Sequence, residues 1–258
     1  MEVSKAEFER AYRDEAPKLL RLALAMTGNP DDASEVVQDA FCRAYAAISS
    51  FRGECAWSTW LYRVCMNVAT DRIRRRRRLP IEIFVEDMGL TEDEIIDKNP
   101  GDDPLTLALT EDIRTKCLFC FTECLPRRQR QVFCLSHVMG LSQRDIGAIL
   151  GIEANAVKAS LFRARKRLDG YLNDRCDLIR ADNPCSCRQW VRFGIERGIV
   201  SRPRDEDELV RRAERVRAEI GTLLDMRNLY RAAFDASAEE LFTRRLRDGI
   251  ARKQWFSL

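Results

Sequence analysis

Long apolar runs are missing from this sequence. No stretch approaches the roughly 18 consecutive apolar residues that a membrane-spanning helix needs. Residues 1–20, MEVSKAEFERAYRDEAPKLL, lack the apolar core of a signal peptide and have the pattern of an amphipathic helix. Hydrophobic residues make up 45% of the chain and charged residues 33%, a balance typical of soluble proteins. We therefore expect a cytoplasmic protein without membrane association.

The usual marks of an enzyme are missing too. The sequence has no paired catalytic carboxylates, no evident set of nucleophile and base, and no glycine loop of the kind that holds phosphates. Histidine occurs once, as His137 in the stretch SHVMGLS, and we interpret it as a packed helix residue. The sequence therefore predicts a protein that acts by binding and is not an enzyme.

Cysteine, in contrast, is abundant, with ten residues. In a reducing compartment thiols are mostly buried, metal-bound or redox-active. The set that most resembles metal ligands is Cys176, Cys185 and Cys187 in CDLIRADNPCSCRQW, because an Asn-Pro turn and a C-x-C pair bring the thiols together. A structural zinc site takes four ligands and only three are local. Zinc is therefore a hypothesis for this trio, and no cofactor is required.

A second group of thiols lies on one stripe of a predicted helix, at Cys117, Cys120 and Cys124. Half-buried packing is the ordinary role of such a stripe. The alternative is that these residues and the tail trio share a metal ion or an iron–sulfur cluster. We interpret the remaining cysteines as structural: Cys42, Cys55, Cys65 and Cys134.

The most informative stretch is 125–168, which has the pattern of a helix-turn-helix. Ser142, with Asp145 three residues on, is a helix start signal, and Gly151 ends the helix that follows. The second helix has an apolar face at i, i+4, i+7 and i+11, formed by Val157, Leu161, Ala164 and Leu168. The residues predicted to point outward are Asn155, Lys158, Ala159, Phe162, Arg163 and Lys166.

Charge supports a DNA-binding role for this stretch. It holds nine Lys or Arg residues against Asp145 and Glu153, while the net charge of the whole chain is only +3. Such a patch attracts phosphates and makes binding salt-dependent. The alternative is an ordinary helical hairpin with a solvated basic face.

The rest of the chain is also predicted to be helical, in segments of different character. Residues 5–78 form one helical domain that ends in a run of arginines, and 105–172 form a second. Between them, 79–104 carries nine acidic residues against Lys98 and is expected to be an acidic tether.

The tail, 173–258, returns to helix. One face collects Leu209, Ala213, Val216, Ile220 and Leu223, and Ser237 with Glu240 opens a last helix. These apolar faces need a partner, either the rest of the chain or another protein. We hypothesise that this extension is a built-in regulator, tuned by metal or redox state through the adjacent cysteines.

Two separated motifs, in this order, resemble the extracytoplasmic-function group of bacterial sigma factors. Residues 31–78, DDASEVVQDAFCRAYAAISSFRGECAWSTWLYRVCMNVATDRIRRRRR, are similar to region 2 of that family, and 125–168 are similar to region 4. The resemblance implies an all-α fold with two helical domains joined by a linker, to which this chain adds its extension. It implies a factor that binds the clamp and flap of core RNA polymerase, anchors at the −35 element and melts the −10 element of promoter DNA. An anti-sigma factor is a further possible partner.

The resemblance also carries residue roles onto matching positions. Polymerase contact falls on Asp31, Asp32, Glu35, Gln38 and Asp39, with Val36 and Phe41 as candidates whose ordinary role is core packing. Contact with the −10 element falls on Arg52, Trp57, Arg63, Asn67, Arg72, Arg74 and Arg75. Contact with the −35 element falls on Asn155, Lys158, Ser160, Arg163 and Lys166.

Several alternatives stay open at this point. Trp60 is expected in the core, while Trp57 could stack on a base or pack. The arginines could be a solvated helix end, and the tether either a mimic of a nucleic-acid strand or a spacer. This chain departs from the common family pattern at Glu153, at 154–156 and at 159–160, so the promoter sequence is not predicted. The rival functions are a helix-turn-helix regulator that works without polymerase and a metal- or redox-sensing protein.

Overall fold

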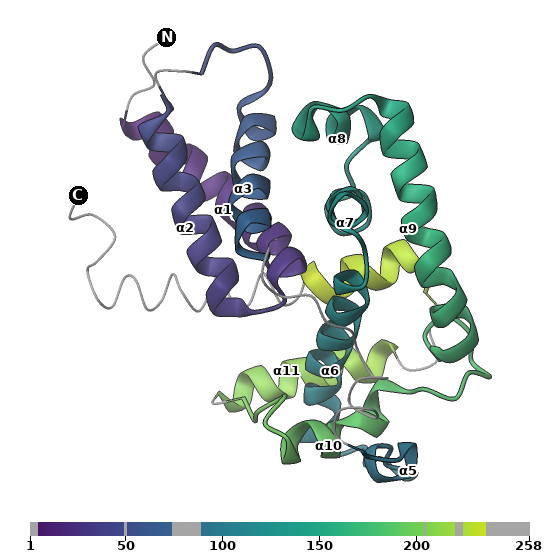
Figure 1. The fold of residues 1–258 in the computed structure, drawn as a ribbon. Coiled ribbons are helices and arrows are strands. Elements are labelled where there is room, and N and C mark those ends of the chain that lie inside the picture. The colour runs from purple at the N-terminus through teal and green to yellow at the C-terminus, as the bar shows by residue number, and fades with distance from the viewer. Residues whose placement is uncertain (1–4, 49–50, 74–88, 204, 220–223, 236–258) are drawn as a thin grey trace. The chain divides into compact units, whose positions relative to one another are not determined.

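The structure is a computed structural model, and it describes the chain except residues 1–4, 49–50, 74–88, 204, 220–223 and 236–258 (Figure 1). Among the described residues there are helices and no named strand, so the all-α prediction is confirmed. No helix in this part of the chain is both long and apolar enough to cross a bilayer. The main helices are α1 (Lys5–Thr27), α2 (Pro30–Ala46), α3 (Trp57–Ile73), α6 (Pro104–Glu123), α7 (Arg127–Phe133), α8 (Gln143–Leu150), α9 (Ala154–Arg175), α10 (Val191–Glu196) and α11 (Glu206–Glu219).

The chain divides into two compact units. The first comprises 1–77, 125–164 and 234–258, and the second comprises 78–124 and 165–233. Helix α9 is continuous across the division. The segment boundaries expected from the sequence remain predictions, because these units group residues by contact and not by order along the chain.

In the first unit, α1, α2 and α3 pack against one another. Helix α2 begins where Asn29 caps it: the Asn29 side chain accepts hydrogen bonds from the backbone N–H of Asp31 (2.8 Å) and Asp32 (3.0 Å). Pro30 suits the first helical position because its fixed φ is already helical. The buried stripe that results faces α1 and α3 and consists of Ala33, Val36, Val37, Ala40, Phe41 and Ala44.

The same unit contains α7, a short π-helical turn η2 (Cys134–Val138), and α8. The buried guanidinium of Arg130 donates to the carbonyl of Met26 at the end of α1. Gln131 Nε2 donates to Thr70 Oγ1 on α3 at 3.0 Å. These buried polar contacts satisfy groups that would otherwise be costly to desolvate, so they fix how α7 packs on α1 and α3.

His137 lies inside this unit. It is buried and stacks on Phe133, with ring centroids 4.3 Å apart and planes 10° apart. Our interpretation of His137 as a packed helix residue is confirmed.

The second unit is built around α6, with α10 and α11 beside it (Figure 1). Leu109 and Ile113 of α6 form a buried cluster with Val191 and Val200, and Leu107 forms another with Ala213 and Val216 of α11. The apolar face of the tail helix therefore packs on its own chain. Residues 220–223 and 236–258, which include the predicted Ile220, Leu223, Ser237 and Glu240, lie outside the described residues.

Ion pairs reinforce the docking of α11 on α6. Arg215 makes a bidentate contact with Glu111, at 3.0 Å for both nitrogen–oxygen pairs. Arg212 contacts Asp112 at 3.0 Å and Glu208 of its own helix at 2.8 Å. Charge and apolar packing thus position α11 together.

The described end of the acidic tether belongs to this unit and is structured. A short helix α5 (Glu92–Ile95) buries Ile95 completely. Arg188 pairs with Asp102, and Arg192 Nε lies 4.0 Å from an oxygen of Asp97. Tail arginines therefore partly neutralise the tether here, which its composition alone did not indicate. Its role as a strand mimic or a spacer remains a prediction.

Candidate nucleic-acid interface

The turn between α8 and α9 is fixed at both ends of α8. Ser142 Oγ accepts a hydrogen bond from the backbone N–H of Asp145 at 3.2 Å and donates to its carboxylate at 2.6 Å. At the other end Gly151 adopts φ +64°, the left-handed conformation that ends helices. A Cβ on Gly147 would lie 2.7 Å from the carbonyl oxygen of Ile152, so the turn backbone passes directly over this glycine. The predicted start and stop of this helix are confirmed.

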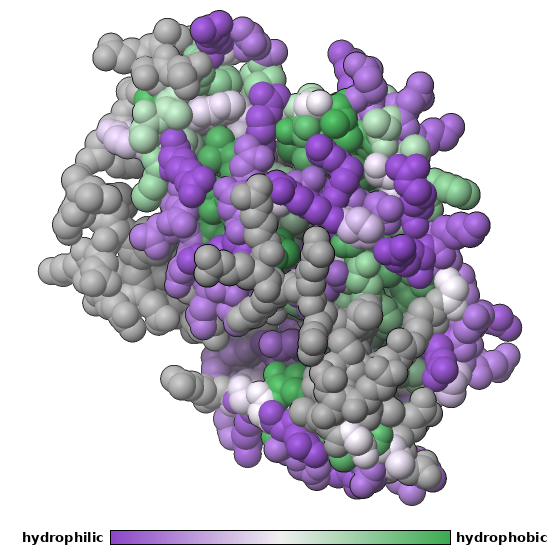
Figure 2. All heavy atoms as spheres, viewed as in Figure 1, coloured by the Kyte–Doolittle hydropathy of each residue, from purple (hydrophilic) through white to green (hydrophobic). Residues whose placement is uncertain are grey.

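Helix α9 has the two faces that its sequence predicts. Val157, Leu161, Ala164 and Leu168 are buried. The side chains exposed to solvent are Asn155, Lys158, Phe162, Arg163 and Lys166. Phe162 is 65% exposed, which is unusual for a large aromatic residue. In Figure 2 hydrophilic residues predominate along the outer edge of α9, where Figure 1 places the helix.

Ser160 differs from its predicted role. It is only 4% exposed, so its side chain offers no surface to DNA as placed here. The reason is its position three residues after Val157 and next to Leu161, at the border of the buried stripe, where a small side chain is accommodated inside.

The region before and along α3 presents a cluster of aromatic residues with cations beside it. Phe51, Trp57 and Trp60 are half-buried and contact one another, with the two Trp centroids 4.9 Å apart. The exposed polar residues predicted to meet the −10 element here are Arg52, Arg63, Asn67 and Arg72. The predicted Arg74 and Arg75 lie outside the described residues.

Two of these cations already have partners in the first unit. Arg63 Nη2 donates to the carbonyl oxygen of Ala148 on α8 at 2.6 Å. Arg72 pairs with the Glu35 carboxylate and donates to the carbonyl of Asp32 at 3.4 Å. Both side chains are held by neighbouring helices in this conformation.

On α2 the candidate polymerase contacts are exposed, and the apolar residues between them are buried. Asp31, Glu35, Gln38 and Asp39 are exposed, and Asp32 is partly exposed. Val36 and Phe41 are buried, which agrees with core packing for both. Tyr45, which the sequence analysis did not single out, is 57% exposed on the same helix.

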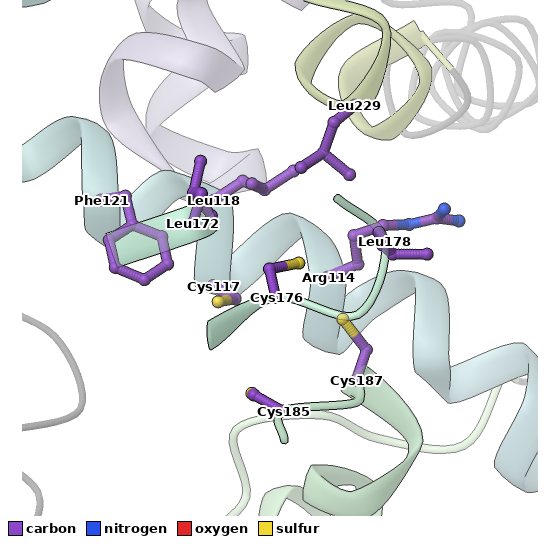
Figure 3. Close-up of a pocket in the computed structure, with 10 residues that line it drawn as sticks. All are labelled: Arg114, Cys117, Leu118, Phe121, Leu172, Cys176, Leu178, Cys185, Cys187 and Leu229. Atoms are coloured by element: carbon purple, nitrogen blue, oxygen red, sulfur yellow. The ribbon is translucent and has the colours of Figure 1, made fainter. Parts of the chain in front are cut away.

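The tail cysteines lie around a pocket of the second unit (Figure 3). Cys176, Cys185 and Cys187 line it together with Cys117 of α6, while Cys120 and Cys124 do not line it. The sequence pattern grouped Cys117 with its helical neighbours, because spacing along one helix is visible in a sequence and contact between distant segments is not.

The fold and these surfaces match a known class of protein. The family model of sigma-70 region 2 matches residues 11–79, and that of sigma-70 region 4 matches residues 116–168. The chain therefore has both regions of sigma-70 factors in their usual order.

Individual relatives narrow the class. The ECF RNA polymerase sigma factor SigW of Bacillus subtilis is 34% identical over 66% of this chain and 89% of its own length. SigE of Mycolicibacterium smegmatis is 30% identical over 64% of this chain, and the match covers 61% of the length of SigE. A solved structure of the sigma factor RpoE in complex with the anti-sigma factor NepR from Bartonella quintana has 25% identity and a TM-score of 0.44, covering 65% of this chain and 97% of that chain.

The chain belongs to the ECF RNA polymerase sigma factors, and it directs promoter-specific initiation of transcription. Matches to both regions favour this function over a regulator that uses the helix-turn-helix without polymerase.

Proposed function

We propose that the chain divides promoter recognition between three surfaces: α2 binds core RNA polymerase, α3 with the preceding turn engages the −10 strand, and α9 anchors at the −35 element. It acts by binding, without bond chemistry of its own, in the cytoplasm where polymerase and promoter DNA meet. The observation that carries the proposal is the exposed basic face of α9, opposite a fully buried face and held by a glycine turn.

The α9 face suits the major groove. Arg163 and Lys158 can donate to guanine edges or phosphates, and Asn155 can pair with adenine. Phe162 stands exposed beside Arg163, and an aromatic side chain there can contact a thymine methyl group. We therefore add Phe162 to the predicted −35 contacts and omit Ser160, which is buried.

The aromatic cluster suits an unpaired strand. Unpaired bases are stabilised when they stack on aromatic rings, and cations beside them neutralise the phosphates of the DNA backbone. Trp57, with Arg52 and Asn67 exposed nearby along the chain, offers both. Arg63 can join only after its side chain releases the Ala148 carbonyl.

The exposed side of α2 suits a protein partner. Its carboxylates and Gln38 are accessible, and Tyr45 adds an exposed aromatic residue of the kind that interfaces favour. This supports polymerase contact at Asp31, Glu35, Gln38 and Asp39, with Tyr45 at the edge.

The test is run-off transcription with purified core polymerase on a genomic promoter library. We expect discrete transcripts that require this chain, and co-purification of the chain with core polymerase. Replacing Gln38 and Asp39 by Ala should lower both, whereas Lys98→Ala on the tether should change neither. Promoter-specific DNA binding without polymerase association would show instead that the helix-turn-helix acts alone.

A further inference from the structure

A small pocket in the second unit brings together four thiols from two distant parts of the chain. Cys117 comes from α6, and Cys176, Cys185 and Cys187 follow α9 (Figure 3). The cavity has a volume of about 20 Å³, and among the described residues Arg114 is the only charged one that lines it, together with four Leu side chains and Phe121. A space of this size holds a single ion or water molecule and no organic ligand.

The backbone holds the three tail thiols in one place. Cys176 and Cys185 form an isolated parallel β-bridge, with Asp177 N–H donating to the Cys185 carbonyl (3.1 Å) and Cys185 N–H donating to the Arg175 carbonyl (3.0 Å). Asn183 Nδ2 donates to the Cys176 carbonyl at 2.9 Å and to the Asn173 carbonyl at 2.8 Å. The loop between the two cysteines is thus closed by hydrogen bonds on both sides.

Cys187 enters from the short 3₁₀ helix η3 (Cys187–Trp190), which packs against α6. Its start is fixed by Ser186, whose N–H donates to Gln189 Oε1 at 2.9 Å. Because η3 lies on α6, Cys187 and Cys117 face one cavity although 69 positions separate them along the chain.

Arg114 lines the same pocket and is only 5% exposed. A buried guanidinium at this pocket can offset part of the negative charge that thiolates acquire on binding a cation.

We propose that Cys117, Cys176, Cys185 and Cys187 form a structural zinc site that fastens residues 176–190 to α6. Four cysteines from a closed loop and a helix are the donor set that structural zinc prefers, and no open position is left for catalysis. As their side chains are placed here, no three or more His, Cys, Asp or Glu residues of the described chain form a group that could hold an ion. Binding therefore requires the thiols to turn inward about their Cα–Cβ bonds.

The first test is metal content and cobalt substitution of the untagged, full-length protein purified under reducing conditions. We expect about one zinc ion per chain, and tetrahedral cobalt–thiolate absorption bands when Co²⁺ replaces it. A chain that carries no zinc, or that takes up cobalt without thiolate bands, overturns the proposal. Neither readout depends on polymerase or promoter, so failure here leaves the proposed function standing.

The second test identifies the ligands by alkylation of the native protein with and without a zinc chelator, read by mass spectrometry. Cys117, Cys176, Cys185 and Cys187 should be protected until the chelator is added. Cys120 and Cys124, on the same helix stripe as Cys117, should react in both conditions. Protection of Cys120 or Cys124 in place of Cys117, or a disulfide among the four without metal, would contradict the assignment.

The matched pair of variants is Cys117→Ser and Cys120→Ser, one turn apart on α6. We expect Cys117→Ser to lose at least about ten-fold in zinc affinity while Cys120→Ser keeps its zinc. Circular dichroism of both variants checks that the total helix content is unchanged. Cys117→His, which restores a donor, should recover part of the affinity. Equal zinc affinity in the two serine variants removes Cys117 from the site.

Discussion

Two glycines of the helix-turn-helix are needed for different reasons. Gly151 takes a backbone conformation that side chains disfavour, whereas Gly147 is helical and is required because the Ile152 carbonyl lies where its Cβ would be. Gly151 can be found from the sequence as a helix end. The need for Gly147 depends on a backbone contact that only the folded turn creates.

Gly147→Ala should therefore destabilise the first unit. A methyl group 2.7 Å from a backbone oxygen forces a shift that costs about 1–3 kcal/mol and outweighs the helix propensity gained. The control is Gly170→Ala in α9, where nothing lies within 4 Å and a gain of about 0.5–1 kcal/mol is expected. Urea unfolding of both variants measures the free energy of unfolding. An equal increase in both variants would mean that the turn accommodates the methyl group without strain.

Lys158→Ala and Arg163→Ala should each weaken binding to the −35 element. A lost base contact costs about 1–3 kcal/mol and relaxes specificity, and a lost phosphate contact lowers the salt slope by about one. Fluorescence anisotropy over a salt series measures both quantities. Arg180→Ala, on the exposed tail loop, is the matched control. If both α9 variants bind like the wild type, another face of α9 contacts DNA.

The same helix shows how far residue roles could be predicted. The 3.6-residue period gave the buried stripe of α9 correctly, because burial of an amphipathic helix is set by its own sequence. Ser160 was assigned to DNA by family resemblance, and the period alone could have placed it at the border of the buried stripe. Phe162 was placed outward by the same period, and the structure adds how fully exposed it is.

At the scale of elements, α11 shows what a sequence pattern leaves open. Its apolar face predicted a packing partner, but the pattern did not distinguish the rest of the chain from another protein. The partner is α6, selected by the fit of Val216 and Ala213 to Leu107 and by Arg215 opposite Glu111. Such a choice depends on side chains about 100 residues apart, which helical periodicity does not report.

Val216→Asp should release α11 from α6. Val216 is buried against Leu107, and an unpaired carboxylate there costs several kcal/mol. Hydrogen exchange should then rise in α11 and on the facing side of α6. Arg217→Asp, one position further on and exposed, introduces the same carboxylate without burial, with a larger change in net charge. Similar exchange in the two variants would argue against the docking seen here.

At the scale of the whole molecule, residues 173–233 of the tail belong to the second unit and are not an appendage. Among its described residues, Val191 and Val200 pack on Leu109 and Ile113 of α6, and Ala213 and Val216 pack on Leu107. The sequence predicted helix in the tail, and α10 and α11 are helical within its described residues, yet it could not reveal that α6 is buried against them.

A chain truncated after Arg175 should consequently be less stable than the intact chain. The apolar residues of α6 that it exposes should bind a hydrophobic dye. Its melting temperature should fall, because burial of apolar surface contributes about 25 cal/mol per Å². Sedimentation and thermal melting measure this. Co-expression of 176–258 as a separate chain should restore stability. A truncated chain that melts like the intact one would return the tail to the role of a removable regulator.

The hydrogen bond from Arg63 to the Ala148 carbonyl has a consequence for how the free factor searches a genome. A side chain expected to grip an opened strand is occupied by the backbone of the −35-reading module, so strand affinity is reduced by the fraction of time this contact persists. Capture of transiently single-stranded DNA by the free factor is thereby weakened by one cationic contact. A partner that draws Arg63 away from the Ala148 carbonyl would return this contact to the strand.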